Sequence, residues 1–182
     1  MTNNTMNDLE QRVVATIAAA LDRNPSTIEP SASLHDIGAE SLDFLDIAFR
    51  LEREFHIRMP RLNVLQRAEE RFGAGTLVID GQLTPLGLRV IRAAMPEVDP
   101  ARIEPGLHAS EVSRLISAQT FVRIVTRMLT ATERALAACP ACAGALTAST
   151  TTPEATCASC GRVVPFPPGD DVLIEDFMAA GQ

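Results

Sequence analysis

Four cysteines in the second half of the sequence have the spacing of a metal site. Cys139 with Cys142 and Cys157 with Cys160 form two C-x-x-C pairs in the stretch CPACAGALTASTTTPEATCASCGR, with 14 residues between the pairs. A C-x-x-C turn brings two thiolates to one metal ion, and two such turns that face each other complete a tetrahedral site. We therefore predict a structural zinc site, because four thiolates leave no coordination position open for a reactive water.

The alternatives for these cysteines are two disulfide bonds or four unreactive thiols. The N-terminal stretch MTNNTMNDLEQRVV is not a basic and apolar signal sequence, so we expect a cytoplasmic protein, in which disulfides are rare. A thioredoxin-like redox pair would need a βαβ context, which the surrounding sequence lacks. The stretch resembles a zinc ribbon, with a β-hairpin between the two pairs and ALTAST and PEAT as its arms.

Ser41 is the second residue that could carry chemistry. It lies in DIGAESLDFLDIAFRLEREFHIRMP, between a glycine turn at Gly38 and an amphipathic helix that we expect to start at Ser41 and to stop before Pro60. No neighbouring residue could activate the hydroxyl as a nucleophile. Ser41 could simply be the N-cap of the helix, but a phosphodiester would also be well placed there, because the start of a helix favours a negative group.

The helix after Ser41 carries two apolar stripes. At 100° per residue, one side holds Phe44, Ile47, Ala48, Leu51 and Phe55. A neighbouring stripe holds Leu42, Leu45 and Phe49, with Asp46, Glu52 and Arg53 beside it. A small domain needs only the first stripe for its core. The periodicity alone leaves open whether the second stripe is also core or an exposed docking surface.

The segment LHDIGAESLDFLDIAFRLEREFHIRMP resembles the acyl carrier protein family, whose hallmark is Gly-x-Asp-Ser-Leu before an acidic helix that ends in Glu/Phe-x-Ile-x-Pro. The residues in register are Gly38, Ser41, Leu42, Asp43, Phe55, Ile57 and Pro60, and Glu40 stands where most members have Asp. The resemblance implies that a phosphopantetheinyl transferase moves 4′-phosphopantetheine from coenzyme A to Ser41. The thiol of this arm then carries acyl groups as thioesters, and the carrier itself is not an enzyme.

The same resemblance implies that partner enzymes dock on the second helix. The expected docking residues are Glu40, Leu42, Asp43, Leu45, Asp46, Phe49 and Glu52. The expected partners are the synthase, reductase, dehydratase or acyltransferase of a dedicated fatty-acid, lipid or polyketide-like pathway. Two alternatives remain open, namely an aminoacyl or peptidyl carrier protein, and a non-carrier zinc-dependent protein-interaction module whose serine is never modified.

The composition excludes several other classes of protein. All 16 positive residues are arginine, so a Walker-type phosphate loop, a Schiff-base lysine and a Ser/Lys pair are ruled out. The net charge of −7 argues against nucleic acid, and residues 131–182 contain only Arg134 and Arg162 as bases, so we expect the ribbon to dock on protein. No apolar run approaches the roughly 18 residues of a membrane-spanning helix. We expect a monomer that is not inserted into a membrane.

The helical pattern supports a mostly α fold. The two resemblances imply an acyl-carrier-like bundle with a long insertion, followed by a small C-terminal β zinc ribbon. Helices are expected at about 6–21, 41–59, 85–95 (with Thr84 as N-cap and Pro96 beyond the end) and 117–138, with Phe121, Ile124 (or Val125) and Met128 of the last helix facing inward. TLVIDGQLT is a weak hairpin signal.

We divide the chain into a carrier domain, 1–133, with an extended segment, 61–116, and a zinc-ribbon module with tail, 134–182. The extension resembles that of specialised carriers, including those that load very-long-chain acyl groups for lipid A, and favours a dedicated pathway. The tail VVPFPPGDDVLIEDFMAAGQ is either a loosely packed end or a partner-binding peptide.

Overall fold

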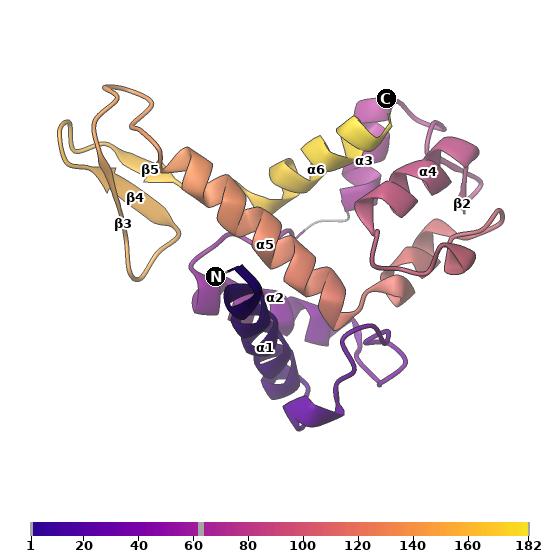
Figure 1. Cartoon of the computed structure of the whole chain (residues 1–182). Helices are drawn as coiled ribbons and strands as arrows, with labels where there is room; N and C mark the ends of the chain where they lie inside the picture. Colours follow the sequence, from indigo (N-terminus) through magenta and orange to yellow (C-terminus); the bar gives the residue numbers. More distant parts are fainter. Residues whose placement is uncertain (1, 62–63, 182) are drawn as a thin grey trace.

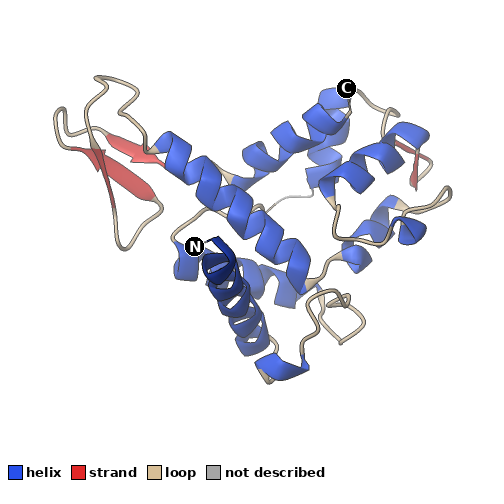
Figure 2. Cartoon of the chain, in the orientation of Figure 1, coloured by secondary structure: helices blue, strands red, loops and turns tan. Residues whose placement is uncertain are grey.

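The chain folds mostly into helices, with one small sheet that projects from them (Figures 1 and 2). The computed structural model describes residues 2–61 and 64–181, so residues 62 and 63 of the predicted extension lie outside the described part. In chain order the elements, with η for a short 3-10 helix, are α1 (Thr2–Ala20), η1 (Pro25–Thr27), α2 (Ser41–Phe55), α3 (Val64–Phe72), β1 (Val78–Ile79), β2 (Gln82–Leu83), α4 (Pro85–Ala94), η2 (Pro100–Arg102), η3 (Ala109–Leu115), α5 (Ala118–Ala135), β3 (Leu146–Ala148), β4 (Glu154–Cys157), β5 (Val163–Pro165) and α6 (Gly169–Ala180). The expected fold class is confirmed. No helix of the described residues combines the length and apolar character needed to cross a membrane.

Helices α1, α2 and α5 pack around one apolar cluster, which we call the carrier core. Each helix contributes side chains spaced three or four residues apart, the spacing that puts them on one helical face. The buried residues include Val13, Ile17, Ile47, Leu51, Phe121, Val125 and Met128. Of the two positions left open on α5, Val125 is fully buried and Ile124 is partly buried. Helix α2 ends at Phe55 because His56 takes left-handed backbone angles (φ 51°, ψ 46°).

The extension has an apolar cluster of its own, built from α3, the β1–β2 hairpin and α4. The weak hairpin signal is confirmed, since β1 and β2 pair antiparallel and both turn residues, Asp80 and Gly81, have positive φ (50° and 82°). The Glu69 carboxylate fastens the chain before β1 to α3, because it accepts the N–H groups of residues 76 to 78 at 2.7 to 3.2 Å. Helix α4 begins as expected, with Thr84 accepting the Gly87 N–H at 3.0 Å.

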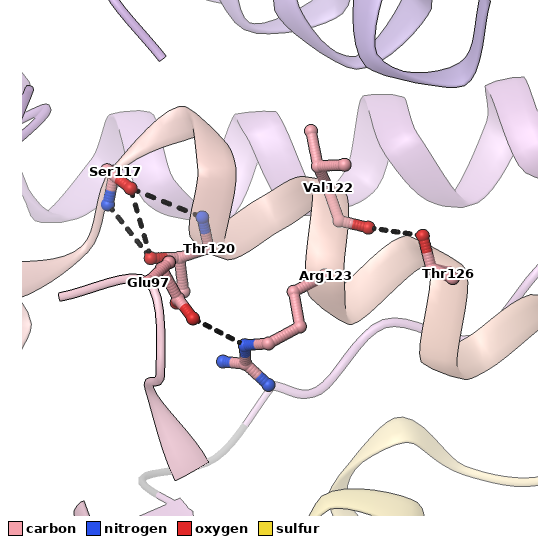
Figure 3. Close-up of polar contacts among 6 residues, drawn as sticks. All are labelled: Glu97, Ser117, Thr120, Val122, Arg123 and Thr126. Atoms are coloured by element: carbon pink, nitrogen blue, oxygen red, sulfur yellow. Dashed lines mark hydrogen bonds and ion pairs between the residues drawn. The ribbon is translucent and has the colours of Figure 1, made fainter. Parts of the chain in front are cut away.

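An ion pair joins the extension to α5 (Figure 3). Arg123 Nε lies 2.9 Å from Glu97 Oε2, and the side chains are 29% and 6% exposed, respectively. The other carboxylate oxygen of Glu97 is buried and has no hydrogen-bond partner among the described residues. Figure 3 also shows the cap of α5, where Ser117 Oγ accepts the Thr120 N–H at 3.2 Å.

The C-terminal tail, which contains helix α6, differs from both structures expected from its sequence. The acidic-apolar tail is neither a loose end nor a free peptide, because it forms a helix that packs against α3, α4 and α5. Val172 and Leu173 belong to the carrier core, whereas Phe177 belongs to the cluster of the extension. Arg127 donates from Nε and Nη2 to the Asp176 carboxylate at 2.9 to 3.0 Å. These hydrogen bonds raise the pKa of Arg127. One helix thus connects the two apolar clusters.

Candidate functional site

Ser41 is the first residue of α2, and its side chain is exposed. The N-cap is Glu40, whose N–H donates to Asp43 Oδ2 at 2.7 Å. The alternative prediction that Ser41 is itself the N-cap is therefore wrong. Since other residues close the start of the helix, the Ser41 hydroxyl is available for modification.

The loop that presents Ser41 is fixed at several points. Gly38 has a φ of 92°, a left-handed value that glycine adopts without strain. Arg23 Nη2 donates to the Ile37 carbonyl at 2.6 Å, which holds the turn from one side. On the other side Ser33 Oγ donates to the carbonyl of Arg114 at 2.6 Å. Hydrogen bonds from both sides therefore hold the loop that precedes the serine.

A shallow hollow of about 380 Å³ lies beside Ser41. Its lining residues are His35, Ala39, Glu40, Leu42, Phe44 and Ser113. Ser113 comes from η3, at the end of the predicted extension, so the extension reaches the surroundings of the serine. Phe44 also stacks on Phe121 of α5, with ring centroids 6.5 Å apart.

The second apolar stripe of α2 is exposed, which answers the question that periodicity left open. Leu42, Leu45 and Phe49 have exposed fractions of 77%, 45% and 48%. The first stripe is buried or half-buried in the carrier core. An exposed apolar stripe on a helix that begins at the candidate modification site has the composition of a docking surface.

The acidic residues around this stripe differ in how far they are free to meet a partner. Glu40 is exposed, whereas Asp46 pairs with Arg50 at 2.7 Å. Glu52 is only 17% exposed, pairs with Arg61 and accepts the Met59 N–H at 2.8 Å. We did not predict Arg61 from the sequence; its position immediately after Pro60, at the end of the matching motif, was the available signal.

The four cysteines converge at one end of the small sheet. Each offers one sulfur, and the four sulfurs lie within 4.8 Å of one another. Cys139 and Cys160 are 3.8 Å apart, and Cys142 and Cys157 are 3.5 Å apart, measured between their sulfurs. These distances exclude disulfide bonds of about 2.05 Å. Zinc–sulfur bonds of about 2.3 Å at tetrahedral angles place sulfurs about 3.8 Å apart, so the donor set fits a zinc ion.

The two C-x-x-C turns have the same backbone geometry. In each, the first cysteine donates its N–H to the carbonyl five positions on and accepts the N–H four positions on, at 2.8 to 3.0 Å. The residue four positions on has a left-handed φ, 58° at Ala143 and 70° at Gly161. Gly144 is needed for close approach, since a Cβ there would lie 2.5 Å from Ser159 Oγ and 3.2 Å from Cys157 Sγ.

The sheet that supports these turns is antiparallel, in the order β3-β4-β5. The predicted hairpin between the cysteine pairs is present, with Leu146 opposite Cys157 and Ala148 opposite Ala155. Strand β5 adds a third strand that we did not predict. Few side chains are buried here, and these include Cys139, Ala155, Cys157 and Phe166.

Backbone donors and neighbouring thiols make the cysteines unequal. The N–H groups of Cys160 and Ser159 lower the pKa of the Cys157 thiol to about 6. At Cys142 the Gly144 N–H lowers the pKa, but hydrogen bonds with the thiols of Cys157 and Cys160 outweigh it and raise the pKa to about 12. The turns thus stabilise at least one thiolate, the protonation state that binds a metal ion.

The exposed serine, its fixed loop and the amphipathic helix behind it define a known class of domain. Residues 11–70 match the family model described as "Phosphopantetheine attachment site". This match covers 60 of the 182 residues and includes Ser41 and the whole of α2. The class is one of carriers, which hold a covalent arm and are not catalysts.

The chain is also similar over 50 to 60 residues to relatives named acyl carrier protein AcpXL. That of Rhizobium meliloti (strain 1021) is 38% identical over 60 residues, which are 32% of this chain and 63% of the relative. That of Rhizobium etli is also 38% identical over 60 residues, 32% of this chain and 65% of the relative. That of Mesorhizobium japonicum is 42% identical over 50 residues, 27% of this chain and 54% of the relative. The chain thus spans less than two thirds of the length of these relatives, and no solved structure matches it.

Proposed function

We propose that this protein is an acyl carrier of a dedicated pathway, with 4′-phosphopantetheine on Ser41 and acyl groups bound to the arm as thioesters. The observation that carries the proposal is an exposed serine at the start of α2, unused in helix capping, inside the segment that matches phosphopantetheine attachment sites. The exposed stripe of Leu42, Leu45 and Phe49 supports it, because a carrier must be recognised by several enzymes in turn.

The modification needs only a presented hydroxyl from this chain. In the transferase complex, Ser41 Oγ attacks the phosphorus of coenzyme A that bears the pantetheine, forming a new phosphorus–oxygen bond. The bond to adenosine 3′,5′-bisphosphate breaks, and the serine proton leaves to a base of the transferase. Once attached, the phosphodiester lies at the start of α2, where the helix favours negative charge. In this proposal the residues of this chain have only to orient the serine.

We further propose that Cys139, Cys142, Cys157 and Cys160 hold one structural zinc ion. The sulfur separations support this assignment, and the small number of buried apolar side chains in the sheet makes a metal necessary for its stability. We retain the division into a carrier domain with its extension, 1–133, and a ribbon module with tail, 134–182. In this division α6 is the part of the second module that returns to the first.

The dedicated pathway is proposed on two grounds. The extension reaches the hollow beside Ser41 through Ser113, so it is placed to affect what the arm carries. The relatives are named acyl carrier proteins, which favours an acyl load over an aminoacyl one. The partners would be a phosphopantetheinyl transferase and the acyl-processing enzymes of that pathway, and we propose that the protein meets them in the cytoplasm.

The experiment that tests this function is intact-mass spectrometry after incubation with coenzyme A and a phosphopantetheinyl transferase. The wild type should gain one phosphopantetheine group, and Ser41→Ala should gain none. Ser113→Ala is the matched control, because Ser113 lines the same hollow but lies outside the matching segment. The assignment would be refuted if the Ser41→Ala variant gained the phosphopantetheine group, or if the wild type did not gain it. The mass of the natively loaded form would then identify the acyl group.

A further inference from the structure

Arg61 covers part of the exposed stripe of α2. Its guanidinium carbon lies 4.0 Å from the centroid of the Phe49 ring, a cation–π contact. The same guanidinium pairs with Glu52, one of the acidic residues expected to take part in docking. Arg61 is 41% exposed in its side chain, so it lies on the surface that a partner would meet.

The position of Arg61 is set by the junction between the ribbon and α6. Its backbone N–H donates to Asp170 Oδ1 at 3.1 Å. The residues just before it are pressed against Gly169, where a Cβ would lie only 2.4 to 2.6 Å from backbone atoms of residues 58 to 60. Arg58 Nη1 donates to the Phe166 carbonyl at 3.3 Å. The segment 58–61 is therefore held by backbone contacts to the C-terminal part of the chain.

This arrangement changes the charge of the docking surface. Arg61 neutralises Glu52 at the C-terminal end of the stripe, and Arg50 neutralises Asp46 beside it. Arg53, one turn from Phe49 and exposed, adds a further positive charge. A partner with a uniformly basic patch would thus meet negative charge near Ser41, at Glu40, but positive charge near Phe49.

We propose that Arg61 is a specificity-determining residue of the docking surface, held over Phe49 by the ribbon–α6 junction, and that the dedicated partners present a carboxylate beside their pocket for Phe49. This inference rests on the proposed carrier function. It differs from the sequence-based expectation, in which all the charged residues assigned to docking were acidic, because it requires partners of mixed charge. Enzymes with a uniformly basic carrier-binding surface are disfavoured by the same residue.

The contact with Phe49 can be tested by fluorescence. The chain contains no Trp and no Tyr, so Phe49→Trp provides a single emitting residue. Replacing Arg61 by Ala in this background should increase quenching by acrylamide, because the guanidinium no longer shields the indole, and Arg61→Lys should restore part of the protection. Arg67→Ala is the control, because Arg67 pairs at 3.2 Å with Asp171, the residue that follows Asp170 in α6. Equal quenching in the Arg61→Ala and Arg67→Ala backgrounds would overturn the proposal.

The effect on recognition can be tested with a phosphopantetheinyl transferase whose carrier-binding surface is basic. At low salt, Arg61→Glu should lower KM for the carrier by about three- to tenfold, with kcat unchanged, and the effect should fade at high salt. Arg67→Glu carries the same change in net charge and should leave KM within about twofold of the wild type. Arg61→Met, which removes one charge without adding another, should show an intermediate decrease in KM.

The outcomes separate this inference from the function on which it rests. If Arg61→Glu lowers KM no more than Arg67→Glu does, or raises it, Arg61 is not a specificity residue although the carrier function stands. If the wild type is not modified at Ser41, the carrier function fails and the inference fails with it. An identified pathway enzyme should show the opposite response, with a higher KM for Arg61→Glu, and an unchanged KM would overturn the proposed carboxylate.

Discussion

Replacement of Arg123 by Met should destabilise the protein far more than replacement of its partner Glu97. Among the described residues, the guanidinium of Arg123 donates to one oxygen of the Glu97 carboxylate, which is 6% exposed and whose other oxygen is unsatisfied. Without Arg123 the carboxylate is left buried and unpaired. Breaking a buried ion pair from one side costs roughly 3–5 kcal/mol. Since Arg123 is 29% exposed, some water can reach the site, and we expect a loss of about 3 kcal/mol, the lower end of that range.

The reverse substitution leaves a different situation. Glu97→Met removes the buried carboxylate, and Arg123 can turn its guanidinium toward water. We therefore expect a change within about 1 kcal/mol in either direction. In the Glu97→Met background, Arg123→Met should cost little, which gives a coupling free energy of about 2–3 kcal/mol between the two residues.

Urea and thermal unfolding followed by circular dichroism at 222 nm, with zinc in excess, would measure these free energies. For a chain of this length, 3 kcal/mol corresponds to a decrease in Tm of about 6–12 °C. Equal losses for Arg123→Met and Glu97→Met, or strictly additive losses in the double variant, would show that the pair does not fasten the extension to α5 in solution.

The remaining predictions concern the serine and the metal. Ser41→Ala should change the free energy of unfolding by less than about 0.5 kcal/mol, because Ser41 is not the N-cap. Asp43→Ala should lower it by about 1 kcal/mol, because this change removes the acceptor of the Glu40 N–H. Urea unfolding of the two variants would measure both values. Metal analysis should find one zinc ion per chain. Chelation of the zinc, or Cys157→Ser, should abolish the dispersed amide signals of residues 139–165 in NMR spectra, while the signals of α5 persist. Loss of dispersion across the whole spectrum would contradict this expectation. Gly144→Ala should weaken zinc binding more than Gly161→Ala does. A Cβ at Gly144 meets Ser159 and Cys157, whereas at Gly161 the space is open and the left-handed φ of 70° is close to the 58° that alanine already adopts at Ala143, the equivalent position of the other turn. Competition with a chromophoric chelator would rank the two variants, and the reverse order would contradict this account of the turns.

The parts of the fold that could be predicted are those in which local sequence patterns decide the structure. The cysteine spacing predicted both turns and the hairpin between them, since the reach of a C-x-x-C turn depends only on local backbone. Thr84 predicted the start of α4, because capping is a contact within one helical turn. The match around Ser41 was also local, so it located the candidate site before any tertiary contact was known.

The features that the sequence did not predict depend on distant contacts. Periodicity left open whether the stripe of Leu42, Leu45 and Phe49 is also core or is exposed, and only the packing of α1 and α5 against the other stripe shows that it is exposed. The role of α6 could not be read from its short acidic-apolar pattern, because its buried face is completed by α3, α4 and α5. Arg61 lies next to Phe49 and Glu52 only once Asp170 and Gly169 have fixed the chain after Pro60.

Helix α6 also has a consequence for how the molecule assembles and comes apart. Because it supplies Val172 and Leu173 to one apolar cluster and Phe177 to the other, neither cluster is complete until residues 169–180 have been synthesised. During translation the segment around Ser41 would therefore emerge long before its supporting core can close. In the finished protein the two clusters share a helix, so they should melt in a single cooperative transition instead of two separate ones.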